Sequence, residues 1–224
     1  MIGARIEEVH ALPDGAAARF DGYHALLCEW NRVVDLTAVT DAEEALHRHY
    51  LDSLTALPFL PEGGRVVDVG TGAGFPGVPL AIARPDLSVV LLDALKKRVV
   101  FLRRVVEALA LSNALPVHER AETYAVRERE AFDVAVSRAV APLPLLLELC
   151  LPLVKVGGRC VFWKGPAAGR EIAEAERVAP LLGGGGLRRV DVSIPGRDFR
   201  HVLVLVDKME ATGPKFPRRA GMAA

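Results

Sequence analysis

The residues of this chain whose types and spacing could bind a reactive cofactor gather in one glycine-rich stretch. Residues 66–80 read VVDVGTGAGFPGVPL, in which Gly72, Gly74 and Gly77 have the spacing G-x-G-x-x-G. Glycine is required where a backbone turns sharply and approaches a ligand closely, because a Cβ atom would clash there. A helix after the loop would direct its first amides at the ligand, and Pro76 suits the beginning of such a helix. The stretch therefore predicts a cofactor-binding turn between a strand and a helix.

Asp68 decides between two classes of cofactor for this loop. The spacing G-x-G-x-x-G alone favours a nicotinamide or flavin dinucleotide. However, Asp68 lies two residues before Gly70, at a point where dinucleotide loops usually keep apolar residues. A carboxylate there accepts hydrogen bonds from loop amides or meets a cationic group of the ligand. S-adenosylmethionine carries an ammonium and a sulfonium, so this pattern favours it; a turn without any ligand is the remaining alternative.

Further polar residues follow the ends of the next apolar runs. Asp93 closes one run, 21 residues after Gly72, and its two carboxylate oxygens suit the two hydroxyls of a ribose. Ala121 and Glu122 follow a third run, and Arg138 ends a fourth. Open α/β sheets bind ligands at the carboxyl ends of their strands, so these residues predict one site. We expect Asp93 to be exposed at the strand edge, so that its replacement by alanine costs little stability.

The elements that must position these residues form two groups. The first 60 residues read as helices, with an apolar pattern through residues 20–30 and a capping box formed by Thr40 and Glu43. After residue 65, helical stretches alternate with short β-rich runs at residues 66–69, 88–92, 116–119, 132–137, 159–163 and 202–206. This alternation predicts an α/β fold with a parallel sheet covered on both faces. The glycine run 183–186 predicts a flexible surface loop.

The composition excludes several classes of protein. The 224 residues are 51% hydrophobic and 25% charged, which indicates one well-buried domain. Three cysteines without a C-x-x-C pair give no disulfide framework or zinc knuckle, and the first residues do not resemble a secretory signal. The most apolar segment, 139–156, contains Glu148 and three prolines, so it predicts a buried helix rather than a membrane span. We therefore expect a soluble, cytoplasmic protein.

The distribution of charge and histidine bears on partners. Residues 1–64 contain 4 Lys/Arg and 11 Asp/Glu, whereas residues 65–224 contain 24 and 17, so the larger part can present a basic face. His47 and His49 are two residues apart on a predicted helix, so they do not share a face, and we expect no metal site. We expect His49, Tyr50 and Asp52 to pack against the site from the N-terminal part. No long apolar surface stripe requires a dimer, so we expect a monomer.

Several longer motifs resemble those of a known family, the bacterial 16S ribosomal RNA guanine-N7 methyltransferases, also called glucose-inhibited division protein B. The motifs are DLTAVTDAEEALHRHYLDSL from Asp35, DVGTGAGFPGVPLAI from Asp68, LLDALKKRVVFL from Leu91, ERAE ending at Glu122, SRAV from Ser137, WKG from Trp163, RHVLVL from Arg200 and KFPRRAG from Lys215. The resemblance implies a Rossmann-like class I S-adenosylmethionine-dependent methyltransferase: a mostly parallel sheet of seven strands in residues 65–224, with residues 1–64 as a helical extension. It also implies methylation of one guanine in the 530 loop of small-subunit rRNA.

The resemblance and the loop pattern together give candidate site residues. The expected cofactor contacts are Asp68, Gly70, Gly72, Gly74, Phe75, Asp93, Ala94, Leu95, Ala121, Glu122 and Arg138. Cationic side chains meet phosphates and guanine edges, so the candidate RNA contacts are Lys164, Arg197, Arg200, His201, Lys215, Arg218 and Arg219. The expected partner is 16S rRNA or the small ribosomal subunit, and S-adenosylhomocysteine is the expected product of the cofactor.

The implied chemistry requires no dedicated general base. Guanine N7 already presents a lone pair on the major-groove edge, so it can attack a methyl group without losing a proton. We therefore assign no catalytic residue and expect catalysis by positioning. Three alternatives remain: a methyltransferase of the same fold acting on another RNA, a protein or a small molecule; a non-enzymatic ribosome-binding module; and a dinucleotide oxidoreductase.

Overall fold

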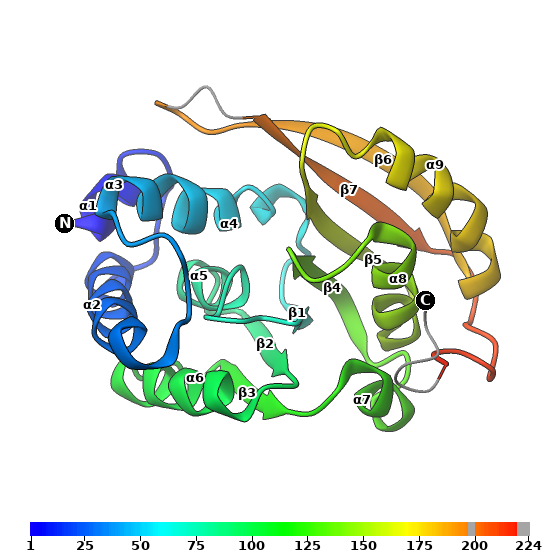
Figure 1. The fold of residues 1–224 in the computed structure, drawn as a ribbon, viewed down its shortest axis with the longest axis horizontal. Coiled ribbons are helices and arrows are strands. Elements are labelled where there is room, and N and C mark those ends of the chain that lie inside the picture. Colours follow the sequence, from blue (N-terminus) through cyan, green and yellow to red (C-terminus); the bar gives the residue numbers. More distant parts are fainter. Residues whose placement is uncertain (197–199, 219–224) are drawn as a thin grey trace.

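A seven-stranded sheet forms the centre of the computed structural model, which describes residues 1–196 and 200–218 (Figure 1). The strand order is β3-β2-β1-β4-β5-β7-β6. The first five strands are parallel, and β7 runs antiparallel to both β5 and β6. The bounds are β1 Gly64–Val69, β2 Leu87–Asp93, β3 Ala114–His118, β4 Phe132–Arg138, β5 Val154–Lys164, β6 Gly184–Ser193 and β7 Arg200–Lys208. The predicted mostly parallel sheet of seven strands is confirmed.

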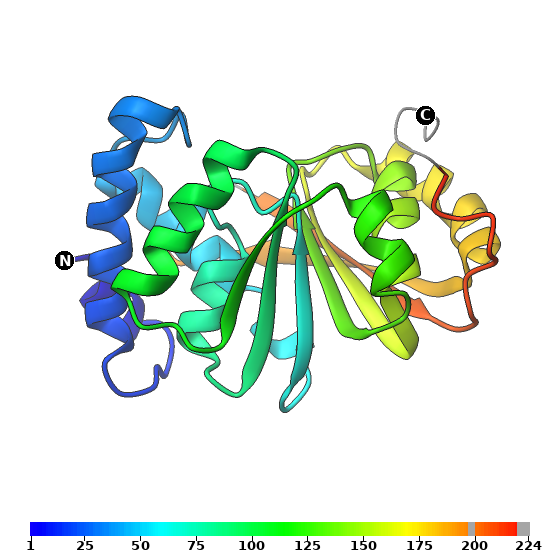
Figure 2. The ribbon, with the colours of Figure 1, turned by 90° about the horizontal axis from the view of Figure 1, so that it is seen from below.

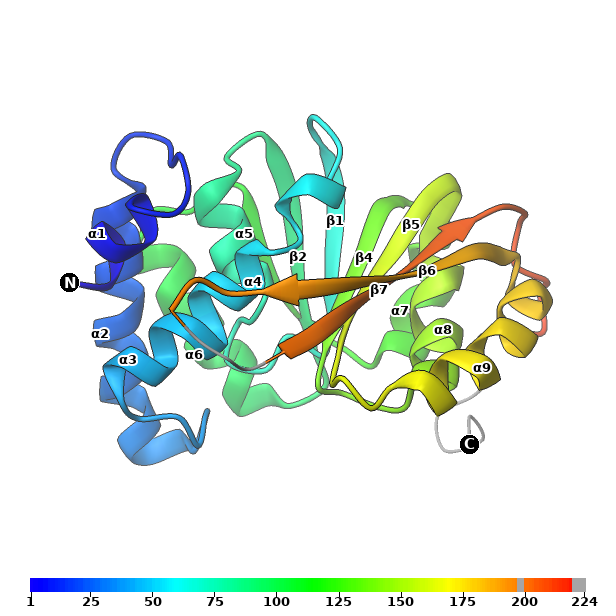
Figure 3. The same ribbon diagram turned by 90° about the horizontal axis from the view of Figure 1, so that it is seen from above.

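Helices cover both faces of this sheet (Figure 2). The segments before the sheet are α1 Ile2–Glu7, α2 Ala16–Val34, α3 Ala42–Ala45, the π-helix η1 Leu46–Leu51, α4 Asp52–Leu54 and the 3-10 helix η2 Leu57–Phe59. The others are α5 Gly77–Ala83, α6 Lys96–Ala108, α7 Ala121–Arg127, α8 Leu143–Cys150, η3 Leu151–Leu153, α9 Gly169–Val178 and η4 Ala179–Leu182. The N-terminal helices gather at one end of the molecule, whereas α8 and α9 lie toward the other (Figure 3).

Alternation along the strands divides the buried side chains between two cores. Val66 and Val136 face the core shared with the N-terminal helices, α5 and α6. Val67 and Ala135, one residue away on the same strands, face the core shared with α7, α8 and α9. Successive side chains of a strand point to opposite faces, so runs that are apolar throughout are buried on both sides.

The N-terminal helices follow the predicted apolar pattern, with one corrected boundary. Phe20, Tyr23 and Leu27 of α2 are buried in the first core. The predicted capping box beginning at Thr40 is wrong. Asp41 caps α3 instead, because its Oδ1 accepts the amide of Glu44 at 2.8 Å.

The glycine run 183–186 is not a flexible loop. Gly184 and Gly185 begin the edge strand β6 and pair with Lys208 and Asp207 of β7. The carbonyl of Gly183 accepts two backbone amides from the chain that follows β7. Gly183 has a φ of +79°, and an added Cβ would lie 2.1 Å from the carbonyl oxygen of Glu210. The run is therefore glycine-rich because two backbones pass close together, and the strand β6 was not among the six runs predicted from residue types.

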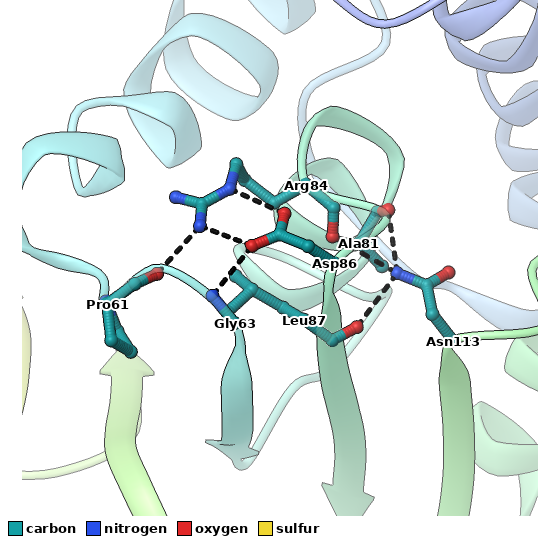
Figure 4. A network of polar contacts seen from close by, with 7 residues as sticks. All are labelled: Pro61, Gly63, Ala81, Arg84, Asp86, Leu87 and Asn113. Atoms are coloured by element: carbon teal, nitrogen blue, oxygen red, sulfur yellow. Dashed lines mark hydrogen bonds and ion pairs between the residues drawn. The ribbon is translucent and has the colours of Figure 1, made fainter.

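A polar network fixes the amino ends of β1, β2 and β3 (Figure 4). The Arg84 guanidinium binds Asp86 at 2.6 Å and the Pro61 carbonyl at 2.7 Å, and Asp86 accepts the amide of Gly63 at 2.8 Å. Asn113 Nδ2 donates to three carbonyls at 3.0–3.2 Å, those of Ala81, Arg84 and Leu87. These contacts tie β1, β2 and β3 together where the three strands begin, opposite the carboxyl ends at which the loop lies.

The apolar segment 139–156 contains less helix than the sequence predicted. Its helix α8 covers only Leu143–Cys150, and the segment ends in β5 after a 3-10 turn at Pro152. Across residues 1–196 and 200–218, no helix combines the length and apolar character needed to cross a bilayer.

Candidate cofactor and substrate site

A pocket of about 350 Å³ opens at the carboxyl ends of β1 and β2. It lies where the strand order reverses direction between β1 and β4, the point at which open α/β sheets bind ligands. Its lining residues come from the strand ends and from α7 and α8: Val69, Gly70, Leu92, Asp93, Ala94, Glu119, Arg120, Ala121, Glu122, Val140, Ala141, Leu145 and Leu149. Its volume falls within the range of roughly 300–1,000 Å³ that small-molecule sites occupy.

Gly70 shapes the floor of this pocket. Its φ is +72°, and an added Cβ would lie 2.5 Å from the Val140 side chain. Its amide donates to the carbonyl of Leu92 at 2.9 Å, which joins the loop to the end of β2. A larger residue would both strain the backbone and displace Val140, so glycine is required here for steric reasons.

Asp68 lies beneath the loop and does not line the pocket. Its side chain is fully buried, and Oδ2 accepts the Thr71 hydroxyl at 2.6 Å and the Gly77 amide at 2.8 Å. Burial raises the pKa of this carboxyl to about 7, although both hydrogen bonds oppose the shift. Of the two roles open to Asp68 from the sequence, the structure supports the one in which it holds the loop.

Asp93 lines the pocket, but the expectation that its side chain is exposed is wrong. The residue is only 3% exposed, and its two oxygens accept the amide of Gly72 at 2.9 Å and that of Leu95 at 2.8 Å. Arg98 approaches the same carboxylate at 3.4 Å. Each carboxylate oxygen has two lone pairs, so acceptor capacity remains for the hydroxyls of a ribose. The carboxylate is thus a structural link between the loop and β2 as well as a candidate ligand contact.

The remaining cofactor candidates divide between the pocket and the opposite side of the loop. Ala94, Ala121 and Glu122 line the pocket, as the sequence predicted for one shared site. Leu95 is 46% exposed and contributes its backbone amide to Asp93. The pocket lining does not include the other candidates, Gly72, Gly74, Phe75 and Arg138. Phe75 instead belongs to the first core, beneath the N-terminal helices.

Aromatic side chains join the loop to the N-terminal helices. The rings of His49 and Phe75 stack with centroids 4.5 Å apart, and Tyr50 meets Phe75 edge to face at 5.4 Å. The Tyr23 hydroxyl donates to the carbonyl of Ala73 at 2.6 Å. Burial lowers the pKa of His49 to about 4, so the ring is neutral at pH 7. Helices that lie 25 to 50 residues before the loop in sequence therefore pack against it.

Arg138 ends β4 and contacts the N-terminal helices. Its Nη1 donates to the carbonyl of Arg48 at 2.9 Å and to Asp52 Oδ2 at 2.8 Å. The guanidinium carbon lies 5.3 Å from the centre of the Phe75 ring, a cation–π distance. Nε2 of His201, near the start of β7, lies against Asp52 Oδ1.

The two neighbouring histidines point to different partners. Nδ1 of His47 contacts the carbonyl of Glu43 at 2.7 Å, whereas Nε2 of His49 contacts the Thr37 hydroxyl at 2.8 Å. Among the residues that the structure describes, no three histidine, cysteine, aspartate or glutamate side chains form a group that could hold a metal ion.

Three of the candidate RNA contacts, Lys164, His201 and Arg218, have polar side-chain partners within the chain, His201 lying against Asp52. Lys164 Nζ binds the Ala141 carbonyl and Glu171, both at 2.7 Å, and its side chain is 11% exposed. Arg218 pairs with Glu148 of α8 at 2.6 Å. The remaining candidates are Lys215, whose Nζ lies 5.2 Å from the ring of Phe216; Arg200, whose backbone pairs with Ser193; and Arg197 and Arg219, which lie outside the described residues.

Sequence reasoning missed several residues of the site. Leu145 and Leu149 line the pocket from α8, and their i, i+4 spacing is a signal that could have identified a helix face. Val140 and Ala141 line it from the loop after β4, where residue type gives no such signal. Trp163 belongs to a motif named above, but its contact with the N-terminal helices was not predicted: its Nε1 donates to the Asp52 carbonyl at 3.0 Å.

Comparison with known sequences identifies close relatives. The sequence model of the rRNA small subunit methyltransferase G family (GidB) matches residues 16–194. The chain is 45% identical over 208 residues to ribosomal RNA small subunit methyltransferase G of Clostridium beijerinckii, covering 91% of this chain and 87% of that protein. It is 44% identical over 203 residues to the protein of the same name from Alkaliphilus metalliredigens, covering 89% and 85%.

Comparison with solved structures supports the fold. An rRNA methylase from Streptococcus thermophilus superposes with a TM-score of 0.52 at 18% identity, over 71% of this chain and 94% of that one. TYW2 of M. jannaschii, solved in complex with AdoMet, gives a TM-score of 0.57 at 16% identity, over 71% and 76%. At such identities the likeness concerns the fold alone, a Rossmann-like sheet of class I methyltransferases.

Proposed function

Because this chain belongs to the rRNA small subunit methyltransferase G family, we propose that it transfers a methyl group from S-adenosylmethionine to N7 of a single guanine in the 530 loop of 16S rRNA. The chain is a methyltransferase, and the family match spans both the glycine loop and the strands around the pocket. The observation that carries the proposal is the pocket at the β1–β4 switch point, in which the predicted Asp93, Ala94, Ala121 and Glu122 come together.

The residues of this pocket fit the adenosyl part of S-adenosylmethionine. Asp93 offers carboxylate oxygens to the ribose hydroxyls, and Glu122 offers acceptors beside the adenine. Leu92, Leu145 and Leu149 supply apolar walls, which suit the faces of a flat base. When bound, S-adenosylmethionine supplies a methyl group on a positively charged sulfur.

The protein's contribution to the reaction is positioning. Guanine N7 carries its own lone pair, so no side chain has to remove a proton. The loop held by Asp68 and Asp93 borders the pocket and fixes the cofactor, which is one of the two reactants. Correct orientation of two reactants can supply roughly 7–11 kcal/mol of barrier lowering.

The small-molecule alternative predicts an enclosed acceptor site. The described pocket fits a cofactor, and the basic excess of residues 65–224, 24 Lys/Arg against 17 Asp/Glu, supports a polyanionic acceptor.

An rRNA substrate also implies action where ribosomes assemble, so we propose a cytoplasmic protein that meets 16S rRNA or the small subunit as a monomer.

Two measurements test the proposal. In titration calorimetry, S-adenosylmethionine and S-adenosylhomocysteine are expected to bind and NAD is not; tight binding of NAD would overturn the cofactor assignment. In mass spectrometry of 16S rRNA from cells with and without the gene, one N7-methylguanosine is expected to disappear from the 530-loop fragment. An unchanged modification profile would favour a methyltransferase that acts on another acceptor.

A further inference from the structure

Residues 212–218, the C-terminal segment, are bonded to the chain shortly after the end of α7. In Figure 1 this segment (red) lies at the same end of the molecule as α7 and α8. The Glu130 carboxylate accepts the amide of Thr212 at 2.8 Å. The Arg129 guanidinium donates at 2.5–3.0 Å to the backbone carbonyls of three residues of the segment: Thr212, Gly213 and Phe216. Because one guanidinium binds three carbonyls, it fixes the path of the whole segment.

Arg218, at the end of the C-terminal segment, is bonded to α8. Its backbone amide and its guanidinium donate to both carboxylate oxygens of Glu148, at 2.6–3.2 Å. The Glu148 side chain is only 5% exposed and belongs to an otherwise apolar helix. Hydrogen bonds from Arg218 lower the pKa of this carboxyl, so it is charged at neutral pH. Without Arg218, α8 would therefore carry a buried charge that has lost its partner.

The two helices that the C-terminal segment connects also form two walls of the cofactor pocket. One wall contains Ala121 and Glu122 of α7, and the other contains Leu145 and Leu149 of α8. Glu148 lies three residues after the first of these leucines and directly before the second, so a shift of its backbone moves both. The contact between Arg218 and Glu148 therefore bears on the space between the two walls.

We propose that Arg218 is a positioning residue for the cofactor: by binding Glu148, it holds α8 at the distance from α7 that the adenosyl group of S-adenosylmethionine requires. The inference rests on the cofactor assigned in the proposed function, and it gives the C-terminal segment a part in that pocket. It also gives Arg218 a role different from the RNA contact expected from the sequence, because the guanidinium is bonded to a buried carboxylate. A pocket whose walls are already held loses less conformational freedom when its ligand binds.

The test uses Arg218→Gln in the full chain, which removes the charge that binds Glu148. In titration calorimetry without RNA, the Kd for S-adenosylmethionine is expected to rise about tenfold, because Leu145 and Leu149 have to be ordered again when the cofactor binds. The same rise is expected for S-adenosylhomocysteine, which shares the adenosyl part. Arg170→Gln is the matched control, since it alters an arginine of α9 that is 92% exposed and pairs with a glutamate on the surface; its Kd is expected to stay within about twofold of wild type.

Cofactor affinity separates positioning from simple stabilisation. A variant that is only less stable has a larger unfolded fraction, but the Kd of its folded form is unchanged. Urea unfolding of each variant therefore accompanies the titrations, which are made at a temperature where the protein is folded. With small subunits as substrate, the KM for S-adenosylmethionine is expected to rise about tenfold in Arg218→Gln, whereas kcat at saturating cofactor stays within about twofold of wild type.

Two further variants test the path from the C-terminal segment to the pocket. Glu148→Gln removes the same contact from the side of α8. If Arg218 acts through Glu148, the Kd of Arg218→Gln/Glu148→Gln is no higher than that of the weaker-binding single variant. Arg129→Gln loosens the segment at α7 and is expected to raise the Kd in the same direction.

A wild-type Kd for S-adenosylmethionine in folded Arg218→Gln would overturn the inference. If the slope of log K for RNA binding against log salt concentration is then reduced by about 1, Arg218 contacts a phosphate of the RNA instead. Fully multiplicative losses in the double variant would also overturn it. Failure of the proposed function is a separate result: a wild-type protein that binds S-adenosylmethionine but leaves 16S rRNA unmethylated refutes that function and leaves the inference standing, whereas a wild-type protein that does not bind the cofactor refutes both.

Discussion

Replacement of Asp93 by alanine is expected to weaken both the fold and the cofactor site, because one carboxylate serves both. The side chain is 3% exposed and accepts two backbone amides, those of Gly72 and Leu95. Alanine leaves both amides without an acceptor, and each unsatisfied buried group costs about 1–3 kcal/mol. The ion pair with Arg98 adds little, because that arginine side chain is 34% exposed and screened by solvent.

We therefore expect Asp93→Ala to lower the free energy of unfolding by about 2–4 kcal/mol, toward the lower end of that sum because water in the pocket can partly replace the acceptor. For a chain of this length, the melting temperature falls by roughly 2–4 °C for each kcal/mol. Asp93→Asn keeps one acceptor oxygen and turns an amide toward the other backbone N–H, so its loss is expected to be intermediate. Asp191→Ala, on the surface, provides the matched control.

The assay is urea unfolding followed by circular dichroism, without cofactor, combined with calorimetric titration of S-adenosylmethionine. Loss of a charged acceptor for the ribose hydroxyls is expected to raise the Kd at least about tenfold. An unfolding free energy of Asp93→Ala within about 0.5 kcal/mol of wild type would refute the structural role of the carboxylate. Wild-type affinity in a folded variant would refute its assignment to the ribose.

Three further predictions concern other residues around the loop. The pKa of Asp68 is raised from 3.8 to about 7, so its contribution to stability is present below pH 4 and is lost as pH rises to 7. The free energy of unfolding of Asp68→Asn, measured relative to wild type in urea, is therefore expected to increase by up to about 4 kcal/mol between pH 4 and pH 7. A difference between the two proteins that does not change with pH would contradict this. The pKa of His49 is lowered from 6.5 to about 4, so its contribution to stability is present above pH 6.5 and is lost as pH falls toward 4. Between pH 6.5 and pH 4, the free energy of unfolding in urea is expected to fall by up to about 3 kcal/mol less in His49→Gln than in wild type. An equal fall in the two proteins would count against this. Lys164 holds the carbonyl of Ala141 in the pocket wall, so Lys164→Ala is expected to raise the Kd for S-adenosylmethionine. If cofactor affinity is unchanged and the slope of log K for RNA binding against log salt concentration is instead reduced by about 1, Lys164 contacts a phosphate of the RNA.

Local sequence was sufficient for the type of fold and for half of the site. The alternation of apolar runs and helical stretches reports element type, since side-chain periodicity is a property of neighbouring residues. The glycine loop followed β1, and Asp93 ended β2, so parallel strands alone placed the loop, Asp93, Ala121 and Glu122 at one sheet edge. No long-range information was needed for that part of the pocket.

Contacts between residues that are far apart in the chain could not be predicted from the sequence. Asp52 and Arg138 are 86 residues apart, and nothing in their local spacing indicates that they form an ion pair. The glycines at 183–186 looked like a loop because the strand that pairs with them, β7, lies beyond them in the chain. Such pairs form only when packing brings separate elements together.

The sequence by itself determined that this chain builds a parallel α/β sheet with a cofactor loop, because spacing and residue type encode helices, strands and sharp turns directly. Only the tertiary structure decided that Asp68 lies under the loop, that Asp93 is buried, and that Arg138 is held by the N-terminal helices. Burial and hydrogen-bond partners depend on what packs above a residue, and that is set by elements far away in the chain.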